Sequence, residues 1–244
     1  MNDAPADLAT IDPYAIPLAA LNPARPAVFQ ADAHWPFFER LRREAPVHFT
    51  AESEFGPYWS VTKYKDIMAV DTNHQVFSSL STLGGITIRD QNAAFPLPMF
   101  IAMDPPRHDA QRLAVGPIVA PGNLANLEGL IRQRAATILD ALPRGEAFDF
   151  VDRVSIELTT QMLATLFDFP FEDRRKLTRW SDVATAAPGG GIVETEEQRQ
   201  AELRECLAYF MGLWNARLAK PGGNDLIAML QSSPATRDMS PQEF

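Results

Sequence analysis

The sequence has almost no cysteine, since Cys206 is the only one in 244 residues. A single cysteine cannot form a disulfide within the chain, so nothing in the composition points to an oxidising compartment. Long apolar runs are also missing, because no stretch approaches the roughly 18 uninterrupted apolar residues that a membrane-spanning helix needs. The N-terminus lacks the basic segment and apolar core of a signal peptide. We therefore expect a cytoplasmic protein with no membrane span.

Basic residues are in short supply, with 22 Lys and Arg against 31 Asp and Glu and a formal net charge of -9. Such a surface repels polyanions, so we expect no nucleic-acid partner. The sequence lacks the glycine-rich loops that bind nucleotides and the G-x-S-x-G elbow of hydrolases. The histidines do not have the H-x-x-x-H or H-E-x-x-H spacing of zinc sites, and they stand at His34, His48, His74 and His108.

The first 60 residues predict a tail, a helix and a β-hairpin. Residues 1–31 contain several prolines and few periodic apolar positions, so we expect a tail over the surface. Asp32 is placed to cap a helix that continues to about residue 45. Between residues 47 and 61, two short segments of alternating apolar and polar residues flank Gly56-Pro57, which predicts the hairpin.

Residues 80–102 predict a long loop, because they contain two adjacent glycines, two prolines and no sustained period. Loops of this length within a compact domain are usually functional or mobile. A disordered insertion is the alternative, and the apolar content of the segment disfavours it. These apolar residues are Ile86, Ile88, Phe95, Leu97, Met99, Phe100 and Ile101.

The chain after residue 104 is mostly of helical pattern. Apolar residues recur at helical spacing in residues 123–142, 152–167, 172–187, 196–219 and 224–231. Ser240 and Glu243 have the spacing of a capping box with proline at the first helical position, which announces one more helix. We therefore expect residues 32–244 to be one domain that is incomplete at its C-terminus.

The strongest local signal is the segment MDPPRHDAQR, residues 103–112. Asp104 suits the cap of a helix, and Pro105 suits its first position. His108 and Arg112 then stand four residues apart, on one face of that helix. An imidazole and a guanidinium presented together can hold a carboxylate or phosphate. Taken alone, such a pair is more often a solvated helix face.

This segment resembles the D-P-P-x-H-x-x-x-R helix of the cytochromes P-450. The hairpin and short helix upstream, FGPYWSVTKYKDIMAVDTNHQVFSS, are also similar to the N-terminal sheet and B helix of that family. The resemblance extends from about Trp35 to the end. Within the family, FIAMDPPRHDAQR together with VAPGNL at 119–124 is similar to the soluble bacterial alkane-hydroxylating group. The implied fold is mainly α with small β-sheets, namely the N-terminal part of the P-450 fold.

The resemblance also implies an activity, a heme-thiolate monooxygenase that hydroxylates medium-chain alkanes or similar aliphatic substrates with dioxygen. Electrons would come from a ferredoxin and a ferredoxin reductase, and the cofactor would be heme b (iron protoporphyrin). His108 and Arg112 would bind a heme propionate. The loop would supply contacts to a small hydrophobic substrate, with Ile88, Phe100 and Ile101 as the candidates. Residues 172–187 and 194–206 resemble the family's mobile lid.

The sequence departs from the family pattern at the iron ligand. Cys206 lies in a strongly helical segment without the glycines of the family's ligand loop, so we do not expect it to ligate iron. We also expect these residues to lack the family's acid–threonine helix and the E-x-x-R pair that supports its ligand loop. We therefore expect a fragment that is inactive alone, has no metal ligand of its own and does not hold heme stably. The alternatives are a non-catalytic helical protein that binds a ligand or partner and truly ends at 244, and a degenerate copy of the family.

Overall fold

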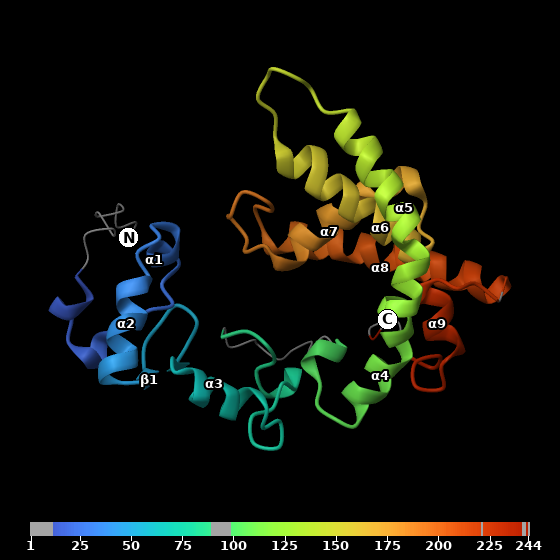
Figure 1. Cartoon of the computed structure of the whole chain (residues 1–244). Helices are drawn as coiled ribbons and strands as arrows, with labels where there is room; N and C mark the ends of the chain where they lie inside the picture. Colours follow the sequence, from blue (N-terminus) through green and yellow to red (C-terminus); the bar gives the residue numbers. More distant parts are fainter. Residues whose placement is uncertain (1–11, 89–98, 221, 241–242, 244) are drawn as a thin grey trace. The chain divides into compact units, whose positions relative to one another are not determined.

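The structure is a computed structural model that describes residues 12–88, 99–220, 222–240 and 243 (Figure 1). The chain divides into two compact units, Met1–His108 and Asp109–Phe244, which we call unit 1 and unit 2. Helices dominate both, and the described residues contain one two-stranded sheet. The predicted fold class, mainly α with a small sheet, is confirmed. The prediction of one incomplete domain over 32–244 stays a prediction.

Unit 1 contains short helices around one hairpin. Two 3-10 turns precede its helices α1, α2 and α3 and its strands β1 and β2, and two more follow them. In chain order they are η2 (Pro13–Ala15), η3 (Leu18–Ala20), α1 (Pro26–Gln30), α2 (Trp35–Glu44), β1 (Val47–Thr50), β2 (Tyr58–Val61), α3 (Tyr64–Asp71), η4 (Ser81–Leu83) and η5 (Phe100–Ala102).

The expected N-terminal tail is, from Asp12 on, part of the core of unit 1. Leu21 and Val28 are fully buried and pack with two residues of α2, Phe37 and Leu41. Arg40, which is also buried, donates hydrogen bonds to the carbonyls of Pro13 and Ile16. Proline-rich segments lack periodic patterns, so the sequence did not reveal how these residues are held.

The start of α2 differs from the prediction. The helix begins at Trp35 with His34 in the cap position, so Asp32 is not its cap. Asp32 instead adopts a left-handed conformation, with φ of 52°. Its carboxylate accepts a hydrogen bond from the indole N–H of Trp35 at 3.2 Å. Asp is one of the few residues that take this conformation readily, because its short polar side chain bonds locally.

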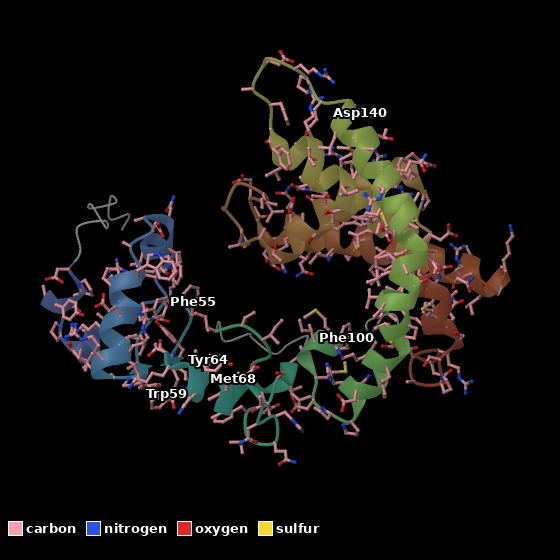
Figure 2. All side chains as sticks on the ribbon, in the orientation of Figure 1. Phe55, Trp59, Tyr64, Met68, Phe100 and Asp140 are labelled. Atoms are coloured by element: carbon pink, nitrogen blue, oxygen red, sulfur yellow. The ribbon has the colours of Figure 1, made fainter. Side chains whose placement is uncertain are left out.

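The predicted hairpin is confirmed, but the face that it buries is not the apolar one. Strands β1 and β2 are antiparallel, and Phe49 is paired with Trp59. His48 and Thr50 are buried, and both side chains are within hydrogen-bond distance of the Leu21 carbonyl. Phe49 and Trp59 are on the exposed face, with ring centroids 4.9 Å apart. Trp59 is labelled in Figure 2. The two buried polar residues are tolerated because a backbone acceptor meets them.

The regular elements in the described residues of unit 2 are all helices, and all five predicted helical segments are found as helices. Helix α4 contains the boundary between the units, and a π-helix leads directly into α6. The elements are α4 (Arg107–Val115), η6 (Gly116–Val119), α5 (Pro121–Asp140), the π-helix η7 (Val151–Ile156), α6 (Glu157–Phe167), η8 (Phe171–Asp173), α7 (Arg175–Thr185), α8 (Glu196–Ala219) and α9 (Leu226–Ser232).

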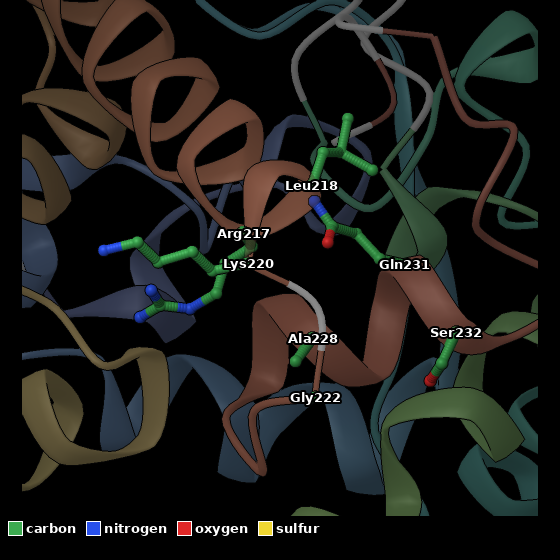
Figure 3. A pocket seen from close by; sticks show the side chains of 7 residues that line it. All are labelled: Arg217, Leu218, Lys220, Gly222, Ala228, Gln231 and Ser232. Carbon is green, nitrogen blue, oxygen red and sulfur yellow. The ribbon is translucent and has the colours of Figure 1, made fainter.

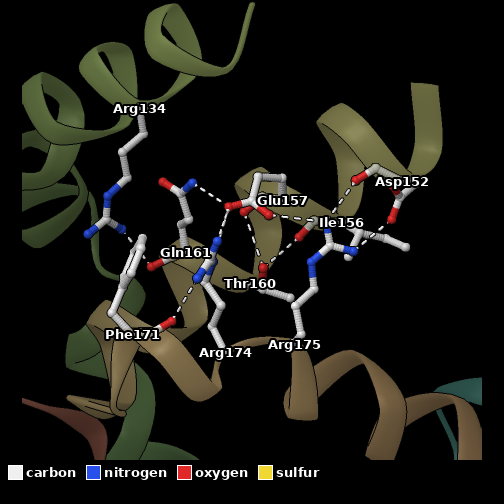
Figure 4. A network of polar contacts seen from close by, with 9 residues as sticks. All are labelled: Arg134, Asp152, Ile156, Glu157, Thr160, Gln161, Phe171, Arg174 and Arg175. Atoms are coloured by element: carbon white, nitrogen blue, oxygen red, sulfur yellow. Dashed lines mark hydrogen bonds and ion pairs between the residues drawn. The ribbon is translucent and has the colours of Figure 1, made fainter. Parts of the chain in front are cut away.

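A hydrogen-bonded ion network joins α6 to α7 around Glu157 (Figure 4). Its carboxylate accepts from Arg174 at 2.6 Å, from Gln161 at 2.7 Å and from Arg175 at 3.2 Å. Arg175 also binds Asp152 in the π-helix at 2.7 Å. Burial opposes the charge on Glu157, but these hydrogen bonds and the Arg174 charge outweigh it and lower the pKa of Glu157 below its usual value.

Arg217, at the end of α8, joins three helices. Its guanidinium binds the carbonyl and the carboxylate of Asp168, which ends α6. It also binds Asp225 at 3.1 Å, and the Asp225 carboxylate in turn caps α9 by accepting from the Ala228 N–H. Arg217 also lines a small pocket of about 170 Å³ between α8 and α9, together with Lys220 and Gln231 (Figure 3).

None of the helices in the described residues is both long enough and apolar enough to cross a membrane.

Candidate functional site

The candidate site is built on α4. The helix begins at Arg107, two residues later than the predicted first position, Pro105. The N–H of His108 donates to the carbonyl of Asp104 at 3.1 Å, which fixes the entry of the chain into the helix. His108 is half-buried and Arg112 is exposed one turn further on. Residues four apart in a helix lie on one face, so the structure supports the predicted geometry of the pair.

An aromatic side chain from the preceding loop contacts the histidine of this pair. The rings of Phe100 and His108 have centroids 6.1 Å apart and are inclined at 36°. Phe100 belongs to the short turn η5, whose end is anchored by the buried Ala102 and Met103. The structure therefore brings one predicted substrate residue, Phe100, to one predicted cofactor residue, His108.

The other predicted substrate residues have fewer defined surroundings. Ile88 and Ile101 are about half exposed, and neither belongs to the hydrophobic clusters of the described residues. Phe95 and Leu97 were expected to contribute apolar surface to the same loop, and they lie outside the described residues. Ile86 and Met99 are exposed on either side of that gap.

Asp104 has a role that the sequence did not show. Its carboxylate accepts from the Ser78 hydroxyl at 2.6 Å and from the Ser79 N–H at 2.9 Å. The hydrogen bond from Ser78, followed by that from Ser79, lowers the pKa of Asp104 below its usual value. The sequence predicted this carboxylate only as a helix cap. In the structure it joins two segments of the chain that are 25 residues apart. The only sequence signal was the pair of serines just before the loop.

Cys206 has the surroundings of a core residue. It packs against a cluster that includes Ala164, Phe169 and Trp180. Burial, together with the nearby charge of Glu205, raises the pKa of its thiol to about 11. A metal ligand must be a thiolate, which these surroundings disfavour. Within the described residues, no group of three or more His, Cys, Asp or Glu side chains is arranged to hold a metal ion.

Two surface hollows lie in unit 2 and contain none of the predicted site residues. One is the pocket between α8 and α9 described above. The other is a groove along α5, lined by apolar residues such as Ile131 and Leu139 and by the charged pair Glu128 and Arg132. The polar side chains of the first pocket include Arg217, which is already bound to Asp168 and Asp225.

Comparison with known proteins identifies the fold. A solved structure titled cytochrome P450-153, from Novosphingobium aromaticivorans, is 42% identical and superimposes with a TM-score of 0.80 over 92% of this chain and 56% of its own. CYP153D17 from Sphingomonas sp. PAMC 26605 is 45% identical, with a TM-score of 0.78 over 90% of this chain and 55% of its own. This chain is a relative of the cytochromes P450. The resemblance seen in the sequence is confirmed.

Curated sequences agree with this relationship. Linalool 8-monooxygenase of Pseudomonas putida is 31% identical over 194 residues, which are 76% of this chain and 48% of that protein. Steroid C26-monooxygenase of Mycolicibacterium smegmatis is 28% identical over 215 residues, which are 84% of this chain and 50% of that protein. No protein-family model matches. The chain thus spans about half the length of the cytochrome P450 relatives that it matches.

Proposed function

We propose that this chain is part of a heme-thiolate monooxygenase that hydroxylates aliphatic substrates, medium-chain alkanes or similar, with dioxygen. The observation that carries the proposal is the helix α4, on which His108 and Arg112 stand one turn apart, with the ring of Phe100 next to that of His108. The similarity to two P450 structures at 42% and 45% identity, and to a monooxygenase at 31%, supports the reaction class.

His108 and Arg112 are proposed to bind one propionate of heme b. Their chemistry fits that group, because an imidazole and a guanidinium on one helix face offer several N–H donors and a positive charge to a carboxylate. When bound, the heme supplies the iron that activates dioxygen. The two side chains neutralise the propionate and fix the orientation of the ring. No residue of this chain is assigned as the iron ligand, and Cys206 is not a candidate.

The substrate is proposed to lie against the apolar residues that precede α4. An alkane has no polar group, so its pocket must consist of apolar side chains. Phe100 is the best-supported contact, because it already meets the ring of His108, and Ile88 and Ile101 are the further candidates. The relatives named for linalool and for a steroid are oxygenases of molecules that consist mostly of hydrocarbon.

The electron donors are proposed to be a ferredoxin and its reductase, in the cytoplasm.

The lid of the substrate pocket is proposed to be the helices α7 and α8, which are held together by several hydrogen bonds. Arg179 binds the Glu202 carboxylate through two nitrogens, at 2.5 and 2.6 Å, and Arg199 of α8 donates to the carbonyl of Val183 in α7 at 3.2 Å. These contacts favour movement of the two helices as one piece.

The proposal is tested by heme binding to the full-length protein. His108→Ala and Arg112→Ala should each weaken heme affinity about tenfold or more, because each removes a hydrogen bond to a charged group. Arg132→Ala is the matched control, since Arg132 is an exposed arginine on α5 that pairs with the neighbouring Glu128. Equal heme affinity in all four proteins would show that the α4 pair does not hold the cofactor.

A further inference from the structure

The two ends of the long loop are fastened together at one carboxylate. Ser78 and Ser79 precede the loop and Asp104 follows it, and both serines donate to Asp104 at 2.6 and 2.9 Å. The Ser78 oxygen also accepts the N–H of Leu80 at 3.0 Å, which completes a tight turn where the loop begins. The link between the two ends of the loop therefore consists of hydrogen bonds among the Asp104 carboxylate, the Ser78 hydroxyl and the backbone amides of the two residues after Ser78.

Asp104 stands midway between the two side chains assigned to substrate and cofactor. Phe100 is four residues before it and His108 is four residues after it. Its carbonyl accepts the first helical hydrogen bond, from the His108 N–H at 3.1 Å. On its other side, the buried Ala102 and Met103 hold the turn that carries Phe100. A fixed Asp104 thus constrains the backbone on both sides of the aromatic contact.

We propose that Asp104 is a positioning residue that holds Phe100 against His108 by tying the backbone between them to Ser78 and Ser79. The proposal rests on the proposed function, because it gives Phe100 and His108 their roles toward substrate and heme. Hydrogen bonds to an ionised carboxylate are shorter and stronger than those between neutral groups, so they suit such a fastening. Without it, the ends of the loop separate and the Phe100 ring leaves His108.

The test compares variants of the full-length protein that separate the hydroxyl from the side-chain volume. Ser78→Ala removes the donor to Asp104, whereas Ser78→Thr keeps it. Asp104→Ala removes the acceptor. Asp71→Asn is the control, since Asp71 is an exposed carboxylate at the end of α3, in the same unit. The readouts are the nuclear Overhauser effect between labelled Phe100 and His108 rings and the hydrogen exchange of the Ser79 amide.

We expect Asp104→Ala and Ser78→Ala to lose the Phe100–His108 effect and to exchange the Ser79 amide about tenfold faster. Ser78→Thr and Asp71→Asn should match the parent. In heme-loaded protein, the two disruptive variants should keep heme and bind a medium-chain alkane about tenfold more weakly.

Persistence of the ring contact in Asp104→Ala would overturn the proposal, even if Ser79 exchanges faster, because Asp104 would then hold only the start of the loop. An unchanged alkane affinity in both disruptive variants would also overturn it. Failure of the parent to bind heme is a different result, since it refutes the proposed function while the ring contact still reports on Asp104.

Discussion

Removal of the Arg217 side chain should destabilise the protein, because the buried carboxylate of Asp225 would then lack its charged partner. Asp225 has a side chain that is only 7% exposed, and Arg217 itself is 18% exposed. Breaking a buried ion pair by removing one partner costs about 3–5 kcal/mol, because the remaining charge is buried without compensation. Asp225 keeps the Ala228 N–H, and Asp168 is 69% exposed and readily solvated. We therefore expect Arg217→Ala to lower the free energy of unfolding by about 2–3 kcal/mol.

Urea unfolding followed by circular dichroism measures this loss directly. In a chain of this size the change corresponds to a fall in Tm of about 4–12 °C. Arg217→Lys keeps the charge but cannot bridge Asp168 and Asp225 together, so it should lie between Arg217→Ala and the parent. Arg132→Ala removes an exposed pair on α5 and should cost less than about 1 kcal/mol. The reasoning is refuted if Arg217→Ala costs no more than Arg132→Ala.

Three further predictions follow from other described contacts. Arg40→Ala should destabilise unit 1 by about 2–3 kcal/mol and speed protease cleavage before residue 26, because the Pro13 and Ile16 carbonyls lose a buried donor; cleavage at the parental rate would contradict this. The lowered pKa of Glu157 means that its contribution to stability is present above its unfolded pKa of about 4.3 and is lost as the pH falls through the lower folded value. The stabilities of the parent and Glu157→Gln should therefore converge in acid, and a constant difference would disprove the role of its charge. Cys206, with a pKa of about 11, should be about one part in a thousand thiolate at pH 8 and should react with thiol reagents mainly after unfolding; fast labelling of the folded protein would contradict its packing.

Local patterns predicted the elements of this fold well, because their causes are local. The hairpin was evident from two alternating segments around Gly56-Pro57, and the long helices from apolar residues at helical spacing. The orientation of the hairpin was not evident. Its polar face is buried because the carbonyl of Leu21 lies beneath His48 and Thr50, and that contact joins residues 27 and 29 positions apart.

In the candidate site, too, the sequence predicted the local features and did not predict the partners of individual side chains. The pair His108 and Arg112 was visible from spacing and motif, and the structure places both on one helix. Asp32 and Asp104 were each predicted to cap a helix, because each stands just before one. The structure gives both side chains other partners, an indole for one and two serines for the other. For Asp104 a tertiary partner overrides the local cap, whereas Asp32 exchanges its cap for a side chain only three residues away.

The most direct test of the central claim is the origin of oxygen in the product. The full-length protein, supplied with a ferredoxin, its reductase and a medium-chain alkane, is incubated under dioxygen labelled with the heavy isotope of oxygen. The proposed monooxygenase should form an alcohol that contains one labelled oxygen atom, and His108→Ala should form less of it. An alcohol without label, or no alcohol from a protein that holds heme, would contradict the account.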